Sequence, residues 1–184
     1  TRSKVSDVKK YRYSGLSFLL YPKLISDITN ENYADFLQEN FYKSLGAKTL
    51  GFTPKTKNFT NKIVPTEIDS LFRKDLTNSW VHDENAALMG GFSGNAGLFG
   101  SALDLARMMQ MYSNYGYYDY KQYISKSTVK EFTTVQYPKN NNRRGLGFDK
   151  PLIGNDTLPI NKAYPAPLVS AESFGHAGFT GTFV

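Results

Sequence analysis

No linker, internal repeat or low-complexity segment interrupts the 184 residues of this chain, and this continuity is what most constrains its fold. About 40% of the residues are apolar, which is enough for one compact domain and too few for two large ones. The 13 tyrosines and 13 phenylalanines favour a folded α+β or β-rich body over a disordered chain. We therefore expect residues 1–184 to belong to a single domain.

Apolar residues at helical spacing predict two consecutive helices near the beginning of the chain. The first covers residues 16–28, where Pro22 is expected to introduce a kink. Asn30 is expected to cap the second helix, and Gly46 to end it. The inward face of the second helix is predicted to carry Tyr33, Phe36, Leu37 and Phe41.

The middle of the chain combines an irregular stretch with a glycine-rich one. Residues 49–81 contain Pro54 and Pro65 and lack a clear period, so we expect a loop region with short strands. Glycines crowd residues 90–100, ahead of a helix that Ser101 is expected to cap. The run lacks the Gly-Lys-Ser/Thr ending of a phosphate-binding loop, so close backbone packing explains it better. The buried face of the following helix is predicted to be Leu105, Met108, Met109 and Tyr112.

The last third of the chain predicts further short elements. Residues 117–124 are expected to form a hairpin, and Ser125 or Ser127 to cap a helix that reaches about residue 134. Residues 145–148 and 178–184 have the pattern of strands. Helices interspersed with short strands predict an α+β fold.

Charge and composition exclude several classes of function. The formal charge of +6 comes from 22 basic and 16 acidic residues, but the basic residues are scattered, with Lys9-Lys10 and Arg143-Arg144 as the longest clusters. A nucleic-acid surface would concentrate them on one helix or stripe. Without cysteine, the chain has neither a disulfide, a thiolate nucleophile nor a cysteine-type zinc site. No apolar run reaches the roughly 18 to 20 residues of a membrane-spanning helix.

The two histidines are the remaining candidates for metal or acid–base chemistry. His82 precedes Asp83, but neighbouring residues on an extended segment point to opposite faces and do not form a pair. Two histidines are also too few for a histidine-rich metal site. We therefore interpret His82 as structural and expect no metal or other cofactor.

Four short motifs follow one another in a distinctive order. Tyr13-Ser14-Gly15 opens a helix, Val81-His82-Asp83-Glu84-Asn85-Ala86 comes next, Gly97-Leu98-Phe99 leads into Asp104-Leu105-Ala106, and His176-Ala177-Gly178 lies near the end. This order resembles the serine β-lactamase and penicillin-binding-protein-like family, in particular the class C type and its esterase relatives. The resemblance covers nearly the whole chain. It implies a β-lactamase/transpeptidase-like fold, in which helices pack on an antiparallel sheet.

In this resemblance Tyr13 corresponds to the tyrosine of a Tyr-x-Asn loop, a candidate general base that shares the nucleophile's proton with a lysine. A phenol is a poor base in water, so the role requires a neighbouring cation, from outside the segment or from a protonated His176. Ser14 is expected to contact the substrate. Gly15 stands where the family often has an amide side chain, which argues against strong β-lactamase activity and leaves peptidase, esterase or amidase chemistry open.

His176-Ala177-Gly178 takes the position of the family's Lys-Thr-Gly strand, with histidine in place of lysine. The resemblance implies that His176 faces the site and orients either Tyr13 or a substrate carboxylate. Gly178 would let a substrate backbone lie against the strand. The backbone N–H of Phe179 or Thr180 would complete an oxyanion hole together with the N–H of the nucleophile.

The family requires a nucleophilic serine in a Ser-x-x-Lys motif. Two such sequences occur, at 6–9 and 127–130, and about one is expected by chance in this composition. Ser6 lies too close in sequence to Tyr13 to return against it, and Ser127 is more simply a helix cap. We therefore expect the nucleophile upstream of Thr1, in a parent protein of which this chain is a fragment. The C-terminal strands of the same domain are expected downstream of Val184.

The resemblance implies a serine hydrolase that forms an acyl-enzyme on an amide or ester, such as a β-lactam, a cell-wall peptide or a small ester. The isolated chain is expected to be inactive. A non-catalytic relative that binds cell-wall peptides stays open, as does a carbohydrate-binding module, which the aromatic richness favours. Expected partners are a small-molecule or peptidoglycan-peptide substrate and the missing segments of the parent chain. The family implies a periplasmic or cell-surface location.

Overall fold

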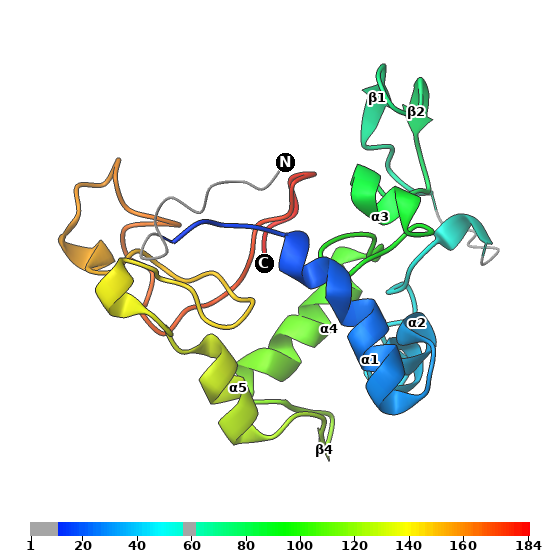
Figure 1. Ribbon diagram of the computed structural model, residues 1–184. Helices are drawn as coiled ribbons and strands as arrows, with labels where there is room; N and C mark the ends of the chain where they lie inside the picture. The colour runs from blue at the N-terminus through cyan, green and yellow to red at the C-terminus, as the bar shows by residue number, and fades with distance from the viewer. Residues whose placement is uncertain (1–10, 57–61) are drawn as a thin grey trace. The chain divides into compact units, whose positions relative to one another are not determined.

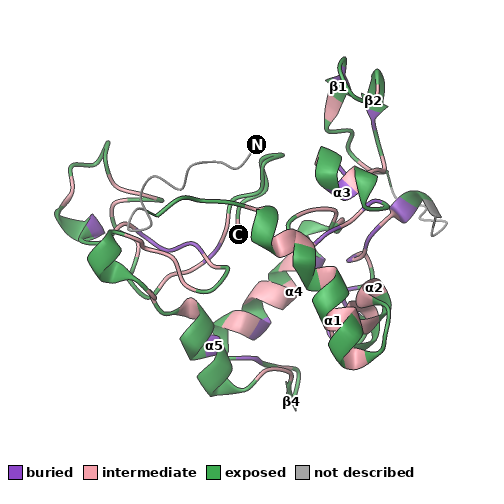
Figure 2. Cartoon of the chain, in the orientation of Figure 1, coloured by how far each residue is buried: buried purple, intermediate pink, exposed green. Residues whose placement is uncertain are grey.

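The computed structural model describes residues 11–56 and 62–184, and these divide into two compact units (Figure 1). Unit 1 contains residues 11–13 and Tyr112–Val184, and unit 2 contains Ser14–Met111. Buried residues occur in both units, but among the described residues the buried apolar side chains belong to unit 2 with the exception of Val129 and Pro151 (Figure 2). That residues 1–184 belong to a single domain stays a prediction.

Unit 2 begins with helical structure, as the apolar spacing predicted. A 3-10 helix over Leu16–Leu20 leads into helix α1 (Tyr21–Thr29). Pro22 lies in the first turn of α1, where its missing N–H costs no hydrogen bond, and the helical stretch changes from 3-10 to α just before it. The predicted kink stays a prediction. Asn30 adopts a left-handed conformation with φ 57° and ends α1.

Helix α2 (Tyr33–Leu37) is capped by Asn32 rather than by Asn30. The Asn32 side chain accepts hydrogen bonds from two backbone N–H groups of the first turn, at 2.9 and 3.4 Å. Because Asn30 already ends α1, it is not available as the cap of the next helix. The helix continues as a π-helical turn over Gln38–Tyr42, and Gly46 follows with φ +69°, as expected of a residue that ends a helix.

Three aromatic rings form the centre of unit 2. The ring centroids of Phe52 and Phe92 lie 4.8 Å apart, and the Tyr33 ring lies 5.7 Å from the first and 6.1 Å from the second. Burial raises the pKa of Tyr33. The buried apolar side chains of the same unit include Tyr42, Leu45, Ala47 and Leu50.

The glycine-rich stretch packs closely against other backbone, as the sequence indicated. A Cβ on Gly97 would lie 2.8 Å from the carbonyl oxygen of Gly91, and Gly97 has φ +107°. A Cβ on Gly94 would collide with the carbonyl oxygen of Phe18. Glycine is required at these positions because any side chain would separate the two backbone segments.

The substitution Gly94→Ala is expected to lower the free energy of unfolding by about 1–3 kcal/mol, because the added methyl group forces the backbone apart. Urea denaturation measures the effect. Gly15→Ala is the matched control, since a Cβ there would lie 3.5 Å from the Asn95 side chain, an ordinary contact. Equal stabilities of the two variants would contradict the close packing.

The irregular stretch contains one β-hairpin, in agreement with the predicted loop region with short strands. Strand β1 (Glu67–Asp69) pairs antiparallel with β2 (Asp75–Thr77). Asp69 organises the turn, because its carboxylate accepts hydrogen bonds from three successive backbone N–H groups at 2.8–2.9 Å. These hydrogen bonds lower the pKa of Asp69 to about 2, and the bond from the Phe72 N–H contributes most.

Helix α4 (Ala102–Ser113) is capped by Ser101, whose hydroxyl accepts the N–H of Asp104 at 3.2 Å. This cap is confirmed. The buried side chains of α4 are Asp104 and Met111, so the buried face is rotated from the predicted one. The rotation is possible because the Asp104 carboxylate accepts the N–H of Thr49 at 2.7 Å and is thereby satisfied. The predicted face is only half-buried; it comprises Leu105, Met108, Met109 and Tyr112.

Unit 1 contains the predicted hairpin and helix. Strands β3 (Tyr117–Tyr118) and β4 (Lys121–Gln122) pair antiparallel, and helix α5 (Lys126–Thr133) follows. Ser125 is the cap of α5 and accepts the N–H of Thr128 at 3.1 Å. The Phe148 ring makes edge contacts with the rings of Tyr112 and Phe174. The centroid distances are 5.4 Å to Tyr112 and 5.1 Å to Phe174. Two 3-10 helices complete the unit, Pro138–Asn140 and Asn155–Thr157.

Two strands predicted in unit 1 are wrong. Residues 145–148 are irregular, because Gly147 has φ +85°, which a strand does not allow. The end of the chain, residues 176–184, folds back on itself as a terminal hairpin instead of continuing as one strand, because Gly181 with φ +97° lies in the reversal. Helices and short antiparallel pairs nevertheless occur throughout, and the predicted α+β class is confirmed.

Candidate functional site

Three side chains of unit 1 come together at the terminal hairpin: Tyr13, Arg144 and His176. The ring centroids of Tyr13 and His176 lie 6.2 Å apart. The Arg144 guanidinium lies over the Tyr13 ring, 4.8 Å from its centroid, and its Nη2 is hydrogen bonded to Nε2 of His176. The Arg144 side chain is 16% exposed, whereas Tyr13 is 63% exposed. Tyr13 and His176, which were predicted from opposite ends of the sequence, are therefore neighbours. The guanidinium of Arg144 is largely buried beside them, whereas the Tyr13 side chain is accessible.

Donor and acceptor chemistry assigns the tautomer of His176. A guanidinium has only donors, so Nε2 must accept the hydrogen bond from Arg144. The other ring nitrogen, Nδ1, lies 2.7 Å from the carbonyl oxygen of Ala177, to which only an N–H donates. His176 in this arrangement is therefore a neutral imidazole with its proton on Nδ1. The cation beside Tyr13 is Arg144, which agrees with the first of the two predicted sources, a residue from outside the Tyr13 segment.

We expect ring-nitrogen NMR spectra to show His176 protonated on Nδ1 and accepting on Nε2. The substitution Arg144→Leu removes the donor to Nε2 and should let the two tautomers exchange. The signals of His82 should not change in this variant and serve as the internal control. A wild-type His176 that carries its proton on Nε2 would contradict the assignment.

The carboxylate of Asp149 holds the two consecutive arginines. It accepts the Nε and Nη2 groups of Arg143 at 2.9 Å each, a bidentate pair, and lies 3.8 Å from Nη1 of Arg144. Burial of Asp149 opposes its charge, but the hydrogen bonds and charge of Arg143, followed by the charge of Arg144, outweigh it and lower the pKa of Asp149. Backbone hydrogen bonds in both directions, at 2.8 and 3.0 Å, pair Asp149 with Gly175, the neighbour of His176. Asp149 thus fixes both arginines beside the terminal hairpin.

Sequence analysis does not identify Arg143, Arg144 or Asp149 as site residues. It shows the arginines only as a basic cluster, and 32 positions separate Arg144 from His176. The available signal is a pair of arginines followed six positions after Arg143 by an aspartate. A partly buried arginine requires a carboxylate partner, so this spacing is a reason to expect an ion pair.

The other predicted residues of the terminal hairpin lie at its turn. The N–H of Gly178 donates to the carbonyl oxygen of Thr182 at 2.6 Å, which closes the turn. Phe179 is 93% exposed, and Thr180 is exposed beside it. In unit 2, the Ser14 hydroxyl accepts the N–H of Leu16 at 3.2 Å, at the start of the first 3-10 helix. Substrate contacts of Ser14, Gly178, Phe179 and Thr180 stay predictions.

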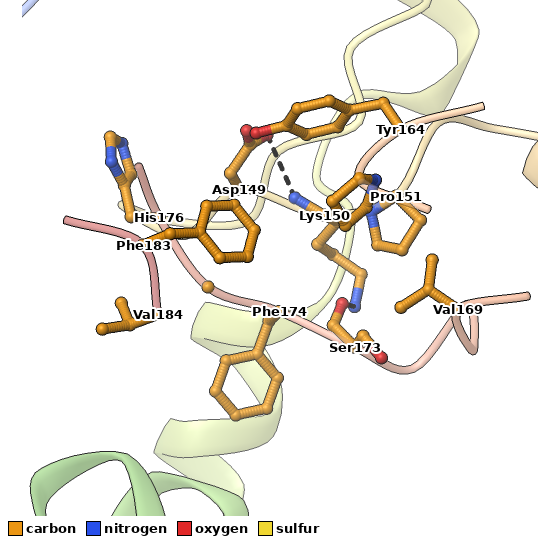
Figure 3. A pocket seen from close by; sticks show the side chains of 12 residues that line it. Asp149, Lys150, Pro151, Tyr164, Val169, Ser173, Phe174, His176, Phe183 and Val184 are labelled. Carbon is orange, nitrogen blue, oxygen red and sulfur yellow. Dashed lines mark hydrogen bonds between the residues drawn. The ribbon is translucent and has the colours of Figure 1, made fainter. Parts of the chain in front are cut away.

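A pocket of about 160 Å³ lies beside His176 in unit 1 (Figure 3). Its apolar lining includes Pro151, Val169 and Phe183. Figure 3 shows Lys150 reaching toward Ser173, with Pro151 and Val169 on one side and Phe183 on the other. The site therefore combines the charged cluster around Arg144 with an adjacent apolar hollow.

The remaining candidates are structural. Nε2 of His82 lies 3.2 Å from Glu67, whereas Asp83 accepts the N–H of Ala86 at 2.8 Å and caps helix α3 (Glu84–Leu88), so the two neighbours do not form a pair. In residues 11–56 and 62–184, no group of three or more acidic or histidine side chains is arranged to hold a metal ion.

Of the two Ser-x-x-Lys sequences, the one at 127–130 does not supply a nucleophile at the site described. Ser127 lies in the first turn of α5, with its hydroxyl 3.0 Å from that of the capping Ser125. The sequence 6–9 lies outside the described residues. In the described part of unit 1, no serine hydroxyl is hydrogen bonded to Tyr13 or His176.

Comparison with known proteins identifies the family. Residues 6–184 match the family model described as Beta-lactamase, so nearly the whole chain takes part. The chain belongs to this family and has the β-lactamase/transpeptidase-like fold. The resemblance inferred from the order of the motifs is confirmed.

The chain is similar to curated proteins named "Putative D-alanyl-D-alanine carboxypeptidase". The protein of Escherichia coli O157:H7 is 34% identical over 185 residues, and those of Escherichia coli K12 and Salmonella typhi are 33% identical. Each match covers 94% of this chain and 41% of the relative, so the chain spans about two fifths of the relatives' length. An octameric penicillin-binding protein homologue from Pyrococcus abyssi aligns with 68% of this chain and 26% of its own, at 17% identity and a TM-score of 0.48.

None of the helices within 11–56 and 62–184 is both long and apolar enough to cross a bilayer.

Proposed function

We propose that this chain forms part of the active site of a serine hydrolase that acts through an acyl-enzyme on amides or esters carrying a free carboxylate. The observation that supports the proposal is the cluster of Tyr13, Arg144 and His176 in a member of the Beta-lactamase family. The similar Escherichia coli protein is named "Putative D-alanyl-D-alanine carboxypeptidase", and this name indicates a peptide with a free C-terminal carboxylate. Amides and esters that carry such a carboxylate, cell-wall peptides among them, are the proposed substrates.

The charge of the cluster favours a substrate carboxylate. Two guanidinium groups, Arg143 and Arg144, face the single carboxylate of Asp149. Arg143 uses two of its donors on that carboxylate, while Arg144 lies further from it and borders the exposed Tyr13 ring. The neutral His176 adds no charge. Among the described residues of this cluster, one positive charge is therefore left uncompensated, and an arginine at such a position pairs well with a carboxylate.

In the proposed mechanism, Tyr13 takes the proton of the nucleophilic serine as the serine oxygen bonds to the substrate carbonyl carbon. For this step Tyr13 must start as the phenolate, and the charge of Arg144 stabilises that negative charge until the proton is taken. The proton then passes to the leaving amine or alcohol as the scissile bond breaks. Water hydrolyses the acyl-enzyme in a second step. We place the nucleophile in a Ser-x-x-Lys motif within the part of the relatives' length that this chain does not span.

The remaining roles follow the family pattern. We propose that Ser14 and Gly178 contact the substrate, and that the N–H of Phe179 or Thr180 contributes to the oxyanion hole. The exposure of the turn that carries Phe179 supports this part of the proposal. A periplasmic or cell-surface location suits an enzyme that acts on cell-wall peptides.

Removing the cation tests the proposed substrate class. In the full-length protein, Arg144→Leu is expected to lower kcat/KM at least tenfold more for a peptide ending in a free carboxylate than for the same peptide ending in an amide. Only the first substrate loses a charge-assisted hydrogen bond, which is worth about 1.5–3 kcal/mol. Steady-state kinetics with the two peptides measure the difference.

The control for this experiment is Lys139→Leu, which removes the same charge at an exposed position of unit 1. It should not change the preference for the carboxylate. Equal losses of Arg144→Leu on both peptides would contradict carboxylate recognition. Carboxylate-dependent binding without any turnover in the wild type would identify a non-catalytic relative instead.

A further inference from the structure

The pocket beside His176 has an almost entirely apolar interior, although charged residues contribute to its lining. Asp149 directs its carboxylate to Arg143. Lys150 is only 8% exposed, and its ammonium donates to the carbonyl oxygens of Ser173 and Glu172 at 3.1 and 3.4 Å. The charged groups are thus occupied by other parts of unit 1. A ligand in the pocket would therefore contact mainly apolar carbon atoms.

The size of the pocket sets the size of the group that fits. Its volume is about 160 Å³. An engineered apolar cavity of about 150 Å³ in another protein holds one benzene molecule. The present pocket therefore has room for one aromatic ring or a branched alkyl group of similar volume, and not for a second ring.

The position of the pocket connects it to the charged cluster. His176 contributes to the lining and is also the residue bonded to Arg144. Phe183 closes the pocket from the opposite arm of the terminal hairpin, where it pairs with Ala177, the neighbour of His176. A group bound in the pocket would therefore lie next to a substrate whose carboxylate is at Arg144.

We propose that this pocket binds an uncharged apolar side chain of the substrate, of the size of a phenyl ring. Among amides and esters with a free carboxylate, it thereby selects those with a side chain larger than the methyl group of alanine. Pro151, Val169 and Phe183 would contact the ring. The link to a substrate rests on the proposed function, whereas binding of a ring by the pocket does not. Charged or larger side chains are excluded because the interior offers neither a free counter-charge nor space.

Titration of fluorobenzene into the full-length protein, followed by fluorine NMR, tests the pocket without any turnover. The wild type should bind this probe saturably. Val169→Trp fills the pocket and should weaken binding at least tenfold. Leu168→Trp is the matched control, because Leu168 is the neighbouring residue and 98% exposed, and it should bind within twofold of the wild type. No saturable binding by the wild type, or equal binding by all three proteins, would overturn the proposal.

A second measurement keeps the test valid where Val169→Trp does not fold. The wild type should prefer a substrate with a phenyl side chain over its methyl counterpart by at least tenfold in kcat/KM, and Phe183→Ala should reduce this preference to less than threefold. Tyr13→Phe should leave fluorobenzene binding unchanged. Ring binding without turnover would therefore reject the proposed function alone, and turnover without side-chain preference would reject the pocket alone.

Discussion

Replacing Tyr13 with phenylalanine in the full-length protein is expected to slow turnover by about 10²-fold or more, the usual effect of losing a general base. Phenylalanine keeps the ring that lies against Arg144 and His176 and removes only the oxygen. Folding should therefore be unaffected. Because the base acts in the chemical step, the loss should appear in kcat, while KM changes little. Steady-state kinetics with a carboxylate-bearing peptide measure both constants.

The matched control is Tyr120→Phe, which removes the same oxygen from a residue of unit 1 that is 93% exposed. Its turnover should equal that of the wild type. Unchanged turnover of Tyr13→Phe would remove Tyr13 from the mechanism. A higher KM with an unchanged kcat would assign it to substrate binding instead.

The substitution Asp149→Asn is expected to lower the free energy of unfolding by about 3 kcal/mol at neutral pH, because it leaves Arg143 and Arg144 without their counter-charge. This value is at the lower end of the range for breaking a buried ion pair, because the Arg143 side chain is 30% exposed. Chemical denaturation measures the loss. Asp156→Asn, at an exposed carboxyl of the same unit, should change stability by less than about 0.5 kcal/mol.

The pH dependence of this effect has a definite sign. The pKa of Asp149 is lower in the folded protein than the value near 3.9 of an unfolded chain. Its stabilisation is therefore fully present above pH of about 5 and is lost as the pH falls through the unfolded value toward the folded one. The stability difference between wild type and Asp149→Asn should shrink in that window. A difference that stays constant from pH 7 to pH 3 would contradict the lowered pKa.

Local sequence signals predict the ends of elements where one side chain decides. Ser101 caps α4 as expected, because its hydroxyl accepts the N–H of Asp104, which has no partner within the first turn of the helix. Asn30 and Asn32 lie two residues apart and have similar capping ability, so sequence does not distinguish them. The left-handed conformation of Asn30 depends on where α1 ends, and this leaves Asn32 to begin α2.

Long-range polar partners are what sequence analysis fails to predict. Asp104 is buried because Thr49, 55 positions earlier, donates to its carboxylate, and this rotates the apolar face of α4. Arg144 belongs to the site because His176 lies 32 positions later. The order of motifs identifies Tyr13 and His176, but no local pattern indicates which cation joins them. Only the three-dimensional structure shows that this cation is Arg144.

The most direct test of the proposed acyl-enzyme is intact-mass spectrometry of the full-length protein after exposure to a reactive penicillin or an activated-ester probe. The account predicts one covalent adduct, on a serine outside these 184 residues, whereas the isolated 184-residue chain stays unlabelled. Peptide mapping identifies the modified residue. An adduct on Ser6 or Ser127 of the isolated chain, or no adduct in the full-length protein, would contradict the account.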